Sequence, residues 1–154
     1  MNIWKATLDD TELLLKLRID YLLDDGKSPT PSEVELIKNK FREYLYKWLV
    51  NDGFFAFVAE KNNAPCSTAF LSIVERPPRN AAASYLVGTV YNVYTYPQHR
   101  RKGIATMVMT ALLHEAKMLN VASIDLLATD AGKPLYKKLG FQEINDYTSM
   151  RLKL

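Results

Sequence analysis

The sequence has little of what stabilises secreted or metal-binding proteins. Cys66 is its one cysteine, so no internal disulfide can form, and no His or Cys lies at metal-ligand spacing around it. We expect Cys66 to be a buried or half-buried small residue and no metal to be bound. The N-terminus has no basic segment followed by an apolar one, as a signal peptide would. These absences favour a reducing, cytoplasmic setting.

Long apolar runs and a strong charge of either sign are also missing. No stretch approaches the roughly 20 apolar residues that a membrane-spanning helix needs, so we expect no membrane partner. The formal net charge of +3 is too small to demand a polyanionic partner. The single short basic run, His99–Lys102, is a poor footprint for nucleic acid, and we expect no nucleic-acid partner.

The chain does have the size and composition of one globular domain. Its 154 residues are 48% hydrophobic and 24% charged, which is enough to bury a core without cross-links. No repeat or low-complexity segment divides it. We therefore expect a single domain over residues 1–154.

Apolar periodicity and turn residues predict a mixed sheet with helices on its faces. Asp9 and Glu12 have the spacing of a helix cap, and Thr30-Pro31 opens a second helix whose apolar stripe carries Trp48 into the core. The expected strands are 1–7, 54–60, 67–75, 84–96 and 122–128, with a strand or hairpin over 141–154. The expected helices run from 9 to 23, from Thr30-Pro31 to the turn 51–53, from 101 to 120 and from 133 to 139.

A basic turn containing a glycine separates the strand over 84–96 from the longest helix. Small residues at Gly103 and Ala105 let a ligand approach the backbone. The first turn of the helix carries unpaired N–H groups and partial positive charge, and a diphosphate suits such a site. The Gly-Lys-Ser/Thr ending of ATP loops and the Gly-x-Gly-x-x-Gly of dinucleotide sites are both absent.

The pattern Arg100-x-x-Gly103-x-Ala105, after a strand and a proline, resembles motif A of the GNAT (GCN5-related N-acetyltransferase) superfamily. Leu135-Tyr136, followed by three residues and Gly140-Phe141, is similar to the C-terminal signature of that family. The opening segment 5–10 also resembles many GNAT N-termini. The resemblance implies a mixed α/β fold of the GNAT type: a central, mostly antiparallel sheet flanked by helices, in the order β-α-α-β-β-β-α-β-α-β.

The resemblance also implies an activity. It is that of an N-acetyltransferase, which moves an acetyl group from acetyl-CoA, the co-substrate, to a primary amine by direct attack in a ternary complex. The alternative is a non-catalytic acyl-CoA-binding or sensing module. A third reading, a nucleic-acid-binding domain, predicts salt-dependent affinity for DNA or RNA. The acceptor stays open between small-molecule and protein amines. Family members often form dimers, so a homodimer is an open alternative.

Site residues are carried over from the family by position. Tyr136 matches the tyrosine that protonates the departing thiolate, with simple packing beside the cofactor sulfur as the alternative. Thr129 or Asp130 stands where many members carry an Asn that contacts the cofactor arm. The other implied cofactor contacts are Val93, Tyr94 and Thr95 for the acetyl group and pantetheine arm, and Arg100, Arg101, Lys102, Gly103, Ile104, Ala105 and Thr106 for the diphosphate.

No catalytic base stands out, although an amine must lose a proton before or during attack. The candidates are Glu75, Asn92 through a bound water, and Tyr91, and a water chain without a dedicated base is an equal alternative. Strand alternation predicts that Tyr91 shares one face with residues 93 and 95, and that Asn92 shares the other with residue 94.

The acceptor side should be formed by the first two helices, the loop between them and the loop 76–83. Asp24, Asp25 and Glu75 would put acidic groups there, which would suit a cationic amine. His99 is expected to be an exposed turn residue, and His114 a surface residue of the long helix.

Overall fold

A five-stranded sheet forms the centre of the protein, in the spatial order β1-β2-β3-β4-β5. The computed structural model describes residues 1–78, 81, 84–146 and 148–154. Neighbouring strands are antiparallel except β4 and β5, which are parallel. This confirms the predicted mixed, mostly antiparallel sheet. The strands are β1 (Asn2–Lys5), β2 (Phe54–Lys61), β3 (Ala64–Glu75), β4 (Leu86–Thr95) and β5 (Ser123–Asp125).

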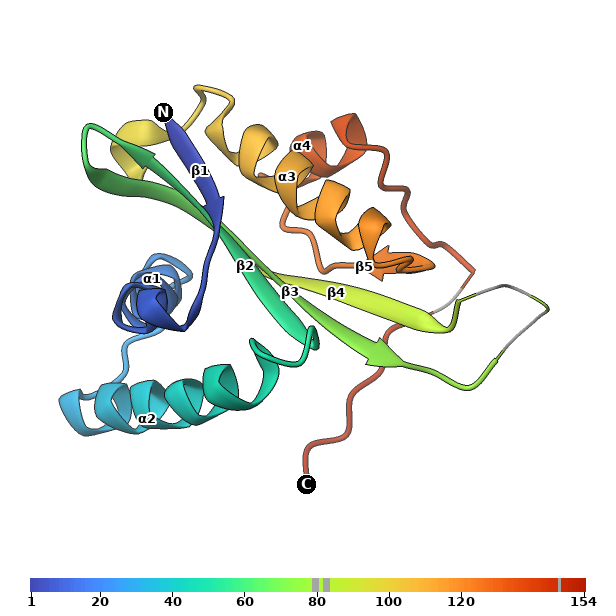
Figure 1. Cartoon of the computed structure of the whole chain (residues 1–154), viewed down its shortest axis with the longest axis horizontal. Helices are drawn as coiled ribbons and strands as arrows, with labels where there is room; N and C mark the ends of the chain where they lie inside the picture. Colours follow the sequence, from blue (N-terminus) through green and yellow to red (C-terminus); the bar gives the residue numbers. More distant parts are fainter. Residues whose placement is uncertain (79–80, 82–83, 147) are drawn as a thin grey trace.

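Helices cover both faces of the sheet. Figure 1 shows α1 (Thr11–Asp24) and α2 (Pro31–Trp48) on one face, and α3 (Ile104–Met118) and α4 (Lys133–Lys138) on the other. Side chains alternate between the two faces along β2. Phe54 therefore packs with residues of α1 and α2, and Phe55 packs with residues of α3. The observed order is thus β-α-α-β-β-β-α-β-α. No helix of the described residues is long and apolar enough to cross a membrane.

The connection between β2 and β3 is tighter than the predicted turn over 61–65. The ladder runs as far as the pair Lys61 and Ala64, so only Asn62 and Asn63 form the loop. Both have positive φ, 53° and 59°, which is the conformation of a type I′ turn that asparagine tolerates. The antiparallel hairpin itself is confirmed.

Capping boxes precede α1 and α2, and the one before α1 is not where the sequence predicted it. α2 begins at Pro31, as expected, and there Thr30 accepts from the Glu33 N–H while the Glu33 carboxylate accepts from the Thr30 N–H. For α1 the Asp9 and Glu12 pair was the wrong choice. Thr7 and Asp10 form the capping box, on a 3₁₀ turn over Leu8–Asp10, and α1 begins at Thr11.

Two expected core or strand features are wrong. Trp48 is 38% exposed because its ring lies over the turn that ends α2, where a Cβ on Gly53 would come within 2.7 Å of it. Among the described residues of 141–154 there is no strand. Met150, Leu152 and Leu154 alternate with polar residues as a strand would, yet they are exposed, since a strand forms only where another strand pairs with its backbone.

The buried cysteine was predicted correctly. Cys66 is fully buried and its Sγ donates to the Ala59 carbonyl at 3.3 Å. His114 is exposed on α3, as expected. His99 is half-buried, and its Nδ1 is a buried atom with no hydrogen-bond partner among the described residues, so the expected exposed histidine is wrong.

Candidate active site

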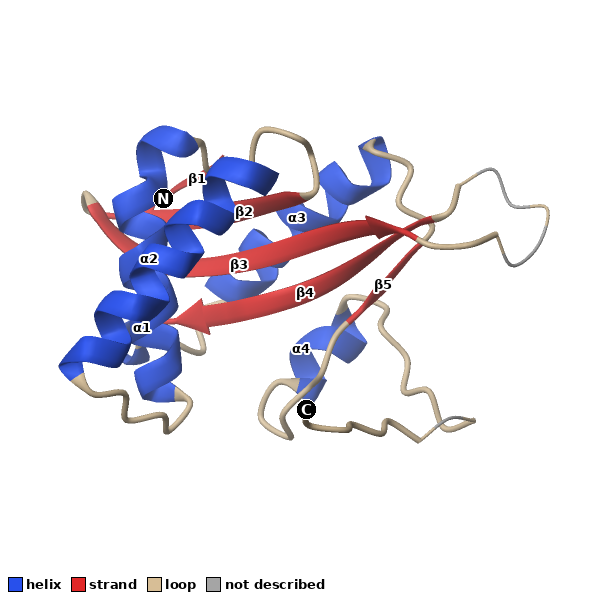
Figure 2. Ribbon diagram, turned by 90° about the horizontal axis from the view of Figure 1, so that it is seen from below, coloured by secondary structure: helices blue, strands red, loops and turns tan. Residues whose placement is uncertain are grey.

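β4 and β5 pair only at one end. Their register consists of Val87 with Ser123, Gly88 with Ile124 and Thr89 with Asp125. Figure 2 shows the two strands meeting at this end and diverging toward the other. From Val90 to Thr95, therefore, β4 has no strand of the described chain on its β5 side. Unpaired N–H and C=O groups along such an edge can bind an extended ligand as an additional strand would.

A β-bulge interrupts β4 beside this open edge. Phe70 of β3 pairs with Tyr91, and Thr68 pairs with Tyr94, so three steps along β4 oppose two steps along β3. The extra residue is accommodated at Asn92, which has φ of 51°, a left-handed conformation that asparagine adopts more readily than most residues.

The bulge overturns the predicted alternation of side chains. Tyr91 and Tyr94 lie opposite Phe70 and Thr68, two residues of the same β3 face, and Phe70 packs on the α1 and α2 side. Val93 instead packs against the core on the α3 side. Tyr91 therefore does not share a face with Val93, as simple alternation had predicted.

Asn92 is held by α1. Its side chain is buried, its Oδ1 accepts from Arg18 Nη1 at 3.1 Å, and its Nδ2 donates to the Leu17 carbonyl at 3.5 Å. Both ends of the amide therefore have protein partners. This arrangement suits a residue that fixes the bulge better than one that holds a water for catalysis.

The turn between β4 and α3 presents backbone donors. Arg101 and Gly103 both have positive φ, 60° and 77°, and α3 begins at Ile104, three residues later than predicted. The first hydrogen bond of α3 runs from the Met107 N–H to the Gly103 carbonyl. The N–H groups of residues 104–106 therefore have no partner within the helix. A Cβ on Gly103 would meet nothing within 4 Å. The turn is open to a ligand and suits an anion.

The basic side chains of this turn are used differently from one another. Arg100 binds both carboxylate oxygens of Asp24 at 2.7 Å, and its Nε donates to the Thr95 carbonyl at 2.8 Å. Lys102 Nζ donates to the Gln98 carbonyl at 2.7 Å, and Arg101 is exposed. Arg100 thus ties the end of α1 to the end of β4, and Asp24 is already neutralised.

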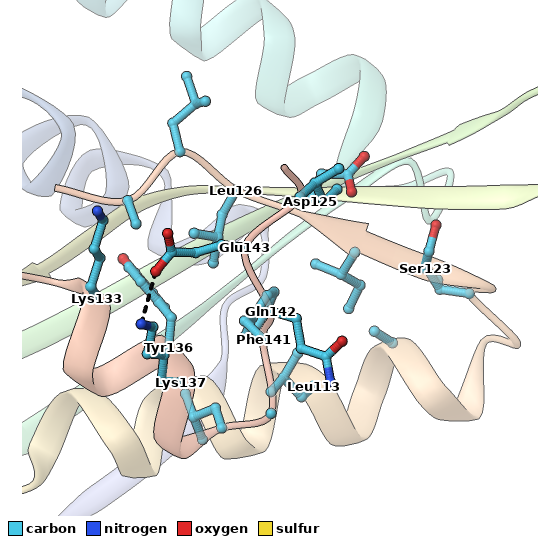
Figure 3. A pocket seen from close by; sticks show the side chains of 18 of the residues that line it. Leu113, Ser123, Asp125, Leu126, Lys133, Tyr136, Lys137, Phe141, Gln142 and Glu143 are labelled. Atoms are coloured by element: carbon cyan, nitrogen blue, oxygen red, sulfur yellow. Dashed lines mark ion pairs between the residues drawn. The ribbon is translucent and has the colours of Figure 1, made fainter. Parts of the chain in front are cut away.

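Tyr136 belongs to α4, which lies on the β5 side of β4 (Figure 2). It is half-buried, packs against the α3-side core and meets Phe141 edge to face at 5.9 Å between ring centroids. Burial raises the pKa of the Tyr136 phenol, and the nearby Tyr21 phenol adds to this rise. Tyr136 also lines a pocket of about 980 Å³ between α3, β5, α4 and the residues that follow, shown in Figure 3.

Three of the expected site residues have other partners or positions. Thr129 supports the turn before α4, because its Oγ1 accepts from the Gly132 N–H at 3.2 Å, and Asp130 pairs with Lys133 at 3.3 Å. Glu75 pairs with Leu86 at the opposite end of β4. Asn92 lies six steps along the chain from Leu86, which is ~20 Å of strand. The structure therefore does not bring Glu75 to the bulge.

Arg18 and Tyr21 on α1 are the residues that sequence reasoning missed. Arg18 bonds to Asn92 at the bulge, and the Arg18 guanidinium lies 5.6 Å from the centroid of the Tyr21 ring. Burial raises the pKa of Tyr21 as it does that of Tyr136. The only signal in the sequence was an arginine inside a leucine-rich helical stretch, three residues before a tyrosine.

Comparison with known proteins identifies the family of this chain. A family model described as "Acetyltransferase (GNAT) domain" matches residues 52–143. The chain belongs to the GNAT acetyltransferase family. None of the curated proteins compared with it matches. Within the described residues, no group of three or more His, Cys, Asp or Glu could hold a metal ion.

Solved structures of acetyltransferases resemble this GNAT chain over almost its whole length. A predicted acetyltransferase from Clostridium acetobutylicum, solved with acetyl-CoA, is 32% identical over 97% of this chain and 95% of that chain, with a TM-score of 0.83. A GCN5-related N-acetyltransferase from Ralstonia eutropha JMP134 is 24% identical over 97% of both, with a TM-score of 0.77. An aminoglycoside antibiotic 6'-N-acetyltransferase from Acinetobacter haemolyticus is 21% identical over 100% of this chain and 99% of that chain, with a TM-score of 0.70, which is a likeness of fold alone.

Proposed function

We propose that this GNAT protein is an acetyl-CoA-dependent N-acetyltransferase that acts on a primary amine in a ternary complex. One observation carries the proposal: the unpaired edge of β4 after Thr89 leads directly into the donor-rich turn at Gly103. An extended, amide-containing arm with a diphosphate at one end needs both features side by side. The relative from Clostridium acetobutylicum, which was solved with acetyl-CoA, supports the same donor.

The donor would bind along these two segments. N–H groups of the turn Gly103–Thr106 would bind the diphosphate, and the edge of β4 over Val93–Thr95 would bind the arm and the acetyl group. Arg101 and Lys102 are both exposed beside the turn and add positive charge. Arg100 would act by holding α1 and β4 together, because its guanidinium is bonded to Asp24 and Thr95.

The transfer itself needs a fixed donor for the carbonyl and a proton for the leaving group. Backbone N–H groups at Val93–Thr95 would stabilise the negative charge that develops on the carbonyl oxygen. The amine nitrogen forms a bond to the acetyl carbon, the carbon–sulfur bond breaks, and the thiolate takes the phenolic proton of Tyr136. Burial raises the pKa of that phenol, so the proton is present at neutral pH.

The proton of the amine would leave to water without a dedicated base. Glu75 lies at the other end of β4, and both ends of the Asn92 amide already have partners in α1. Tyr91 is 50% exposed on the α1 side and has no hydrogen bond that would orient it within the described residues. The water chain therefore has the better support among the alternatives.

Thermal unfolding and thiol release test the proposal together. Acetyl-CoA should stabilise the native state by about 2.7 kcal/mol at 100 times its Kd, because a ligand of the folded form shifts the unfolding equilibrium. A panel of primary amines should then release CoA thiol at a rate that depends on the amine. Stabilisation without thiol release from any amine would support the non-catalytic acyl-CoA-binding module instead. If acetyl-CoA caused no stabilisation and no amine caused thiol release, both functions would be contradicted.

A further inference from the structure

Arg18 lies where α1 covers the bulge of β4. Its Nη1 donates to Asn92 Oδ1 at 3.1 Å, and its guanidinium carbon lies 5.6 Å from the centroid of the Tyr21 ring. The side chain is half-buried. Nothing in the proposed binding of the donor uses it.

The charge of Arg18 has no carboxylate partner among the described residues. The ion pairs of that part of the chain include Arg42 with Glu12 at 2.9 Å and Arg100 with Asp24 at 2.7 Å, but none with Arg18. A guanidinium has five N–H donors, and the described part of the chain binds a single one of them, through the neutral amide of Asn92. A partly buried cation without a counter-ion is unfavourable for folding, so its presence calls for a second explanation.

Electrostatics agree with the geometry. Burial is the main influence on Arg18 and lowers the pKa of its guanidinium, while Tyr21 and Asp25 oppose this. Asp25 is exposed just beyond the end of α1 and forms no ion pair with Arg18. The remaining donors of Arg18 are thus available to an anion that approaches the bulge.

The guanidinium is also close to the proposed chemistry. Its partner Asn92 directly precedes Val93, where the acetyl group is expected. Tyr21, whose ring Arg18 faces, is near enough to Tyr136 to raise the pKa of that phenol. An amine placed to attack the acetyl group would therefore have Arg18 within reach of its other functional groups.

We propose that the acceptor is a primary amine that carries an oxyanion, a carboxylate or a phosphate, and that Arg18 binds this oxyanion. The fork of an arginine matches the two oxygens of such a group. This inference rests on the proposed acetyl transfer and names the substrate class of the same site.

Acceptors with several positive charges fit this site poorly. Of the acidic residues that had suggested a cationic amine, Asp25 is exposed near Arg18, and the other two are not available at the site. Asp24 is paired with Arg100, and Glu75 lies at the opposite end of β4. A polyamine would instead bring positive charge next to the unpaired guanidinium.

Matched acceptors test the inference. Thiol release is measured with α-amino acids, with the corresponding carboxamides, with phosphoethanolamine and with spermidine. A carboxamide differs from its amino acid mainly in lacking the carboxylate charge. We expect kcat/KM to be at least about tenfold higher for the best amino acid or for phosphoethanolamine than for the uncharged or polycationic amines, since a charge-assisted hydrogen bond is stronger than a neutral one. A preference for amino acids would identify the oxyanion as a carboxylate, and a preference for phosphoethanolamine would identify it as a phosphate.

Variants separate binding of the oxyanion from support of the bulge. Arg18→Gln should abolish the preference and Arg18→Lys should keep part of it, while Arg42→Gln, which removes a paired arginine of α2, should leave the preference intact. Stabilisation by acetyl-CoA shows that each variant is folded with a working donor site. As a second readout, calorimetry with CoA present should detect N-acetyl amino acids binding to the wild type and not to Arg18→Gln.

Two results would overturn the inference while leaving the proposed function in place. One is thiol release that is equal or faster with carboxamides or spermidine, with no preference in calorimetry. The other is an Arg18→Gln variant that loses activity equally with every amine, which would make Arg18 a support of Asn92 only. Absence of acetyl-CoA binding and of thiol release in the wild type would instead contradict the proposed function itself.

Discussion

At the scale of single residues, the proton of Tyr136 is what turns a binding site into a catalyst. The Tyr136→Phe variant keeps the ring that packs against Phe141 and removes only the hydroxyl. We expect kcat to fall by about 10²-fold or more, the range for loss of a general acid, with the Kd for acetyl-CoA unchanged. Steady-state thiol release and calorimetry measure the two quantities.

A matched control is Tyr46→Phe, since Tyr46 is a 56% exposed residue of α2 and lies in no part of the proposed site. Its kcat should equal that of the wild type. If Tyr136→Phe also turned over at the wild-type rate, Tyr136 would be no more than a packing residue beside the cofactor sulfur.

The raised pKa of Tyr136 sets the expected pH profile. Burial disfavours the charged phenolate, so the pKa moves upward from its usual value, which is about 10 for a phenol. The protonated acid is the form present below that pKa, and neutral amine becomes more abundant as pH rises. We expect kcat to rise with pH between pH 6 and 9 without a falling limb. A wild-type falling limb below pH 9 that disappears in Tyr136→Phe would contradict the raised pKa.

At the scale of elements, the turn before α3 combines a conformational need with a binding role. Gly103 has φ of 77° and open space beyond its Cα. Replacement by alanine should destabilise the fold by roughly 1–2 kcal/mol, the penalty for a side chain in the left-handed region. It should also weaken acetyl-CoA binding, because the new methyl group occupies space that the diphosphate needs. Urea unfolding and calorimetry measure these effects.

Gly26 offers a control that has the same backbone conformation as Gly103 and no role in the donor site. It has φ of 78°, and a Cβ added there would likewise meet nothing within 4 Å, but it lies just after α1. Gly26→Ala should lose similar stability and bind acetyl-CoA normally. Equal weakening of acetyl-CoA binding in both variants would show that strain, and not contact at Gly103, is responsible.

Most elements were predictable because their signals are local. The helix opened by Thr30-Pro31 and the hairpin between β2 and β3 depend on a few neighbouring residues, and both are found. The misplaced cap of α1 is a local error, but the other main errors concern features decided by distant partners. The bulge at Asn92 depends on its register with β3, and the expected strand within 141–154 would need a neighbour that the sequence pattern does not reveal.

The same distinction applies to the candidate site. The turn at Gly103 was predictable, since its glycine and its helical N–H groups are adjacent in sequence. Arg18 was not, because its partner Asn92 is 74 residues away. An arginine in a helix gives no indication of its neighbours until the helix is packed on the sheet.

At the scale of the whole molecule, the two helical layers meet around one opening in the sheet. α1 lies on one face and α4 on the other (Figure 1), and the separation of β4 from β5 lets side chains of both layers approach. From α1, Arg18 bonds to Asn92 at this edge, and on the other face Tyr136 of α4 is half-buried. The proposed donor and acceptor would thus approach each other from different layers of the fold.

The central claim is that the chain moves an acetyl group from acetyl-CoA to an amine. The most direct measurement incubates the purified protein with acetyl-CoA and the amine panel, and quantifies released CoA thiol and N-acetylated amine by mass spectrometry in the same sample. The account predicts equal amounts of the two products, formed with a preference among the amines. Bound acetyl-CoA that yields neither product, or thiol released with no acetylated amine, would contradict it.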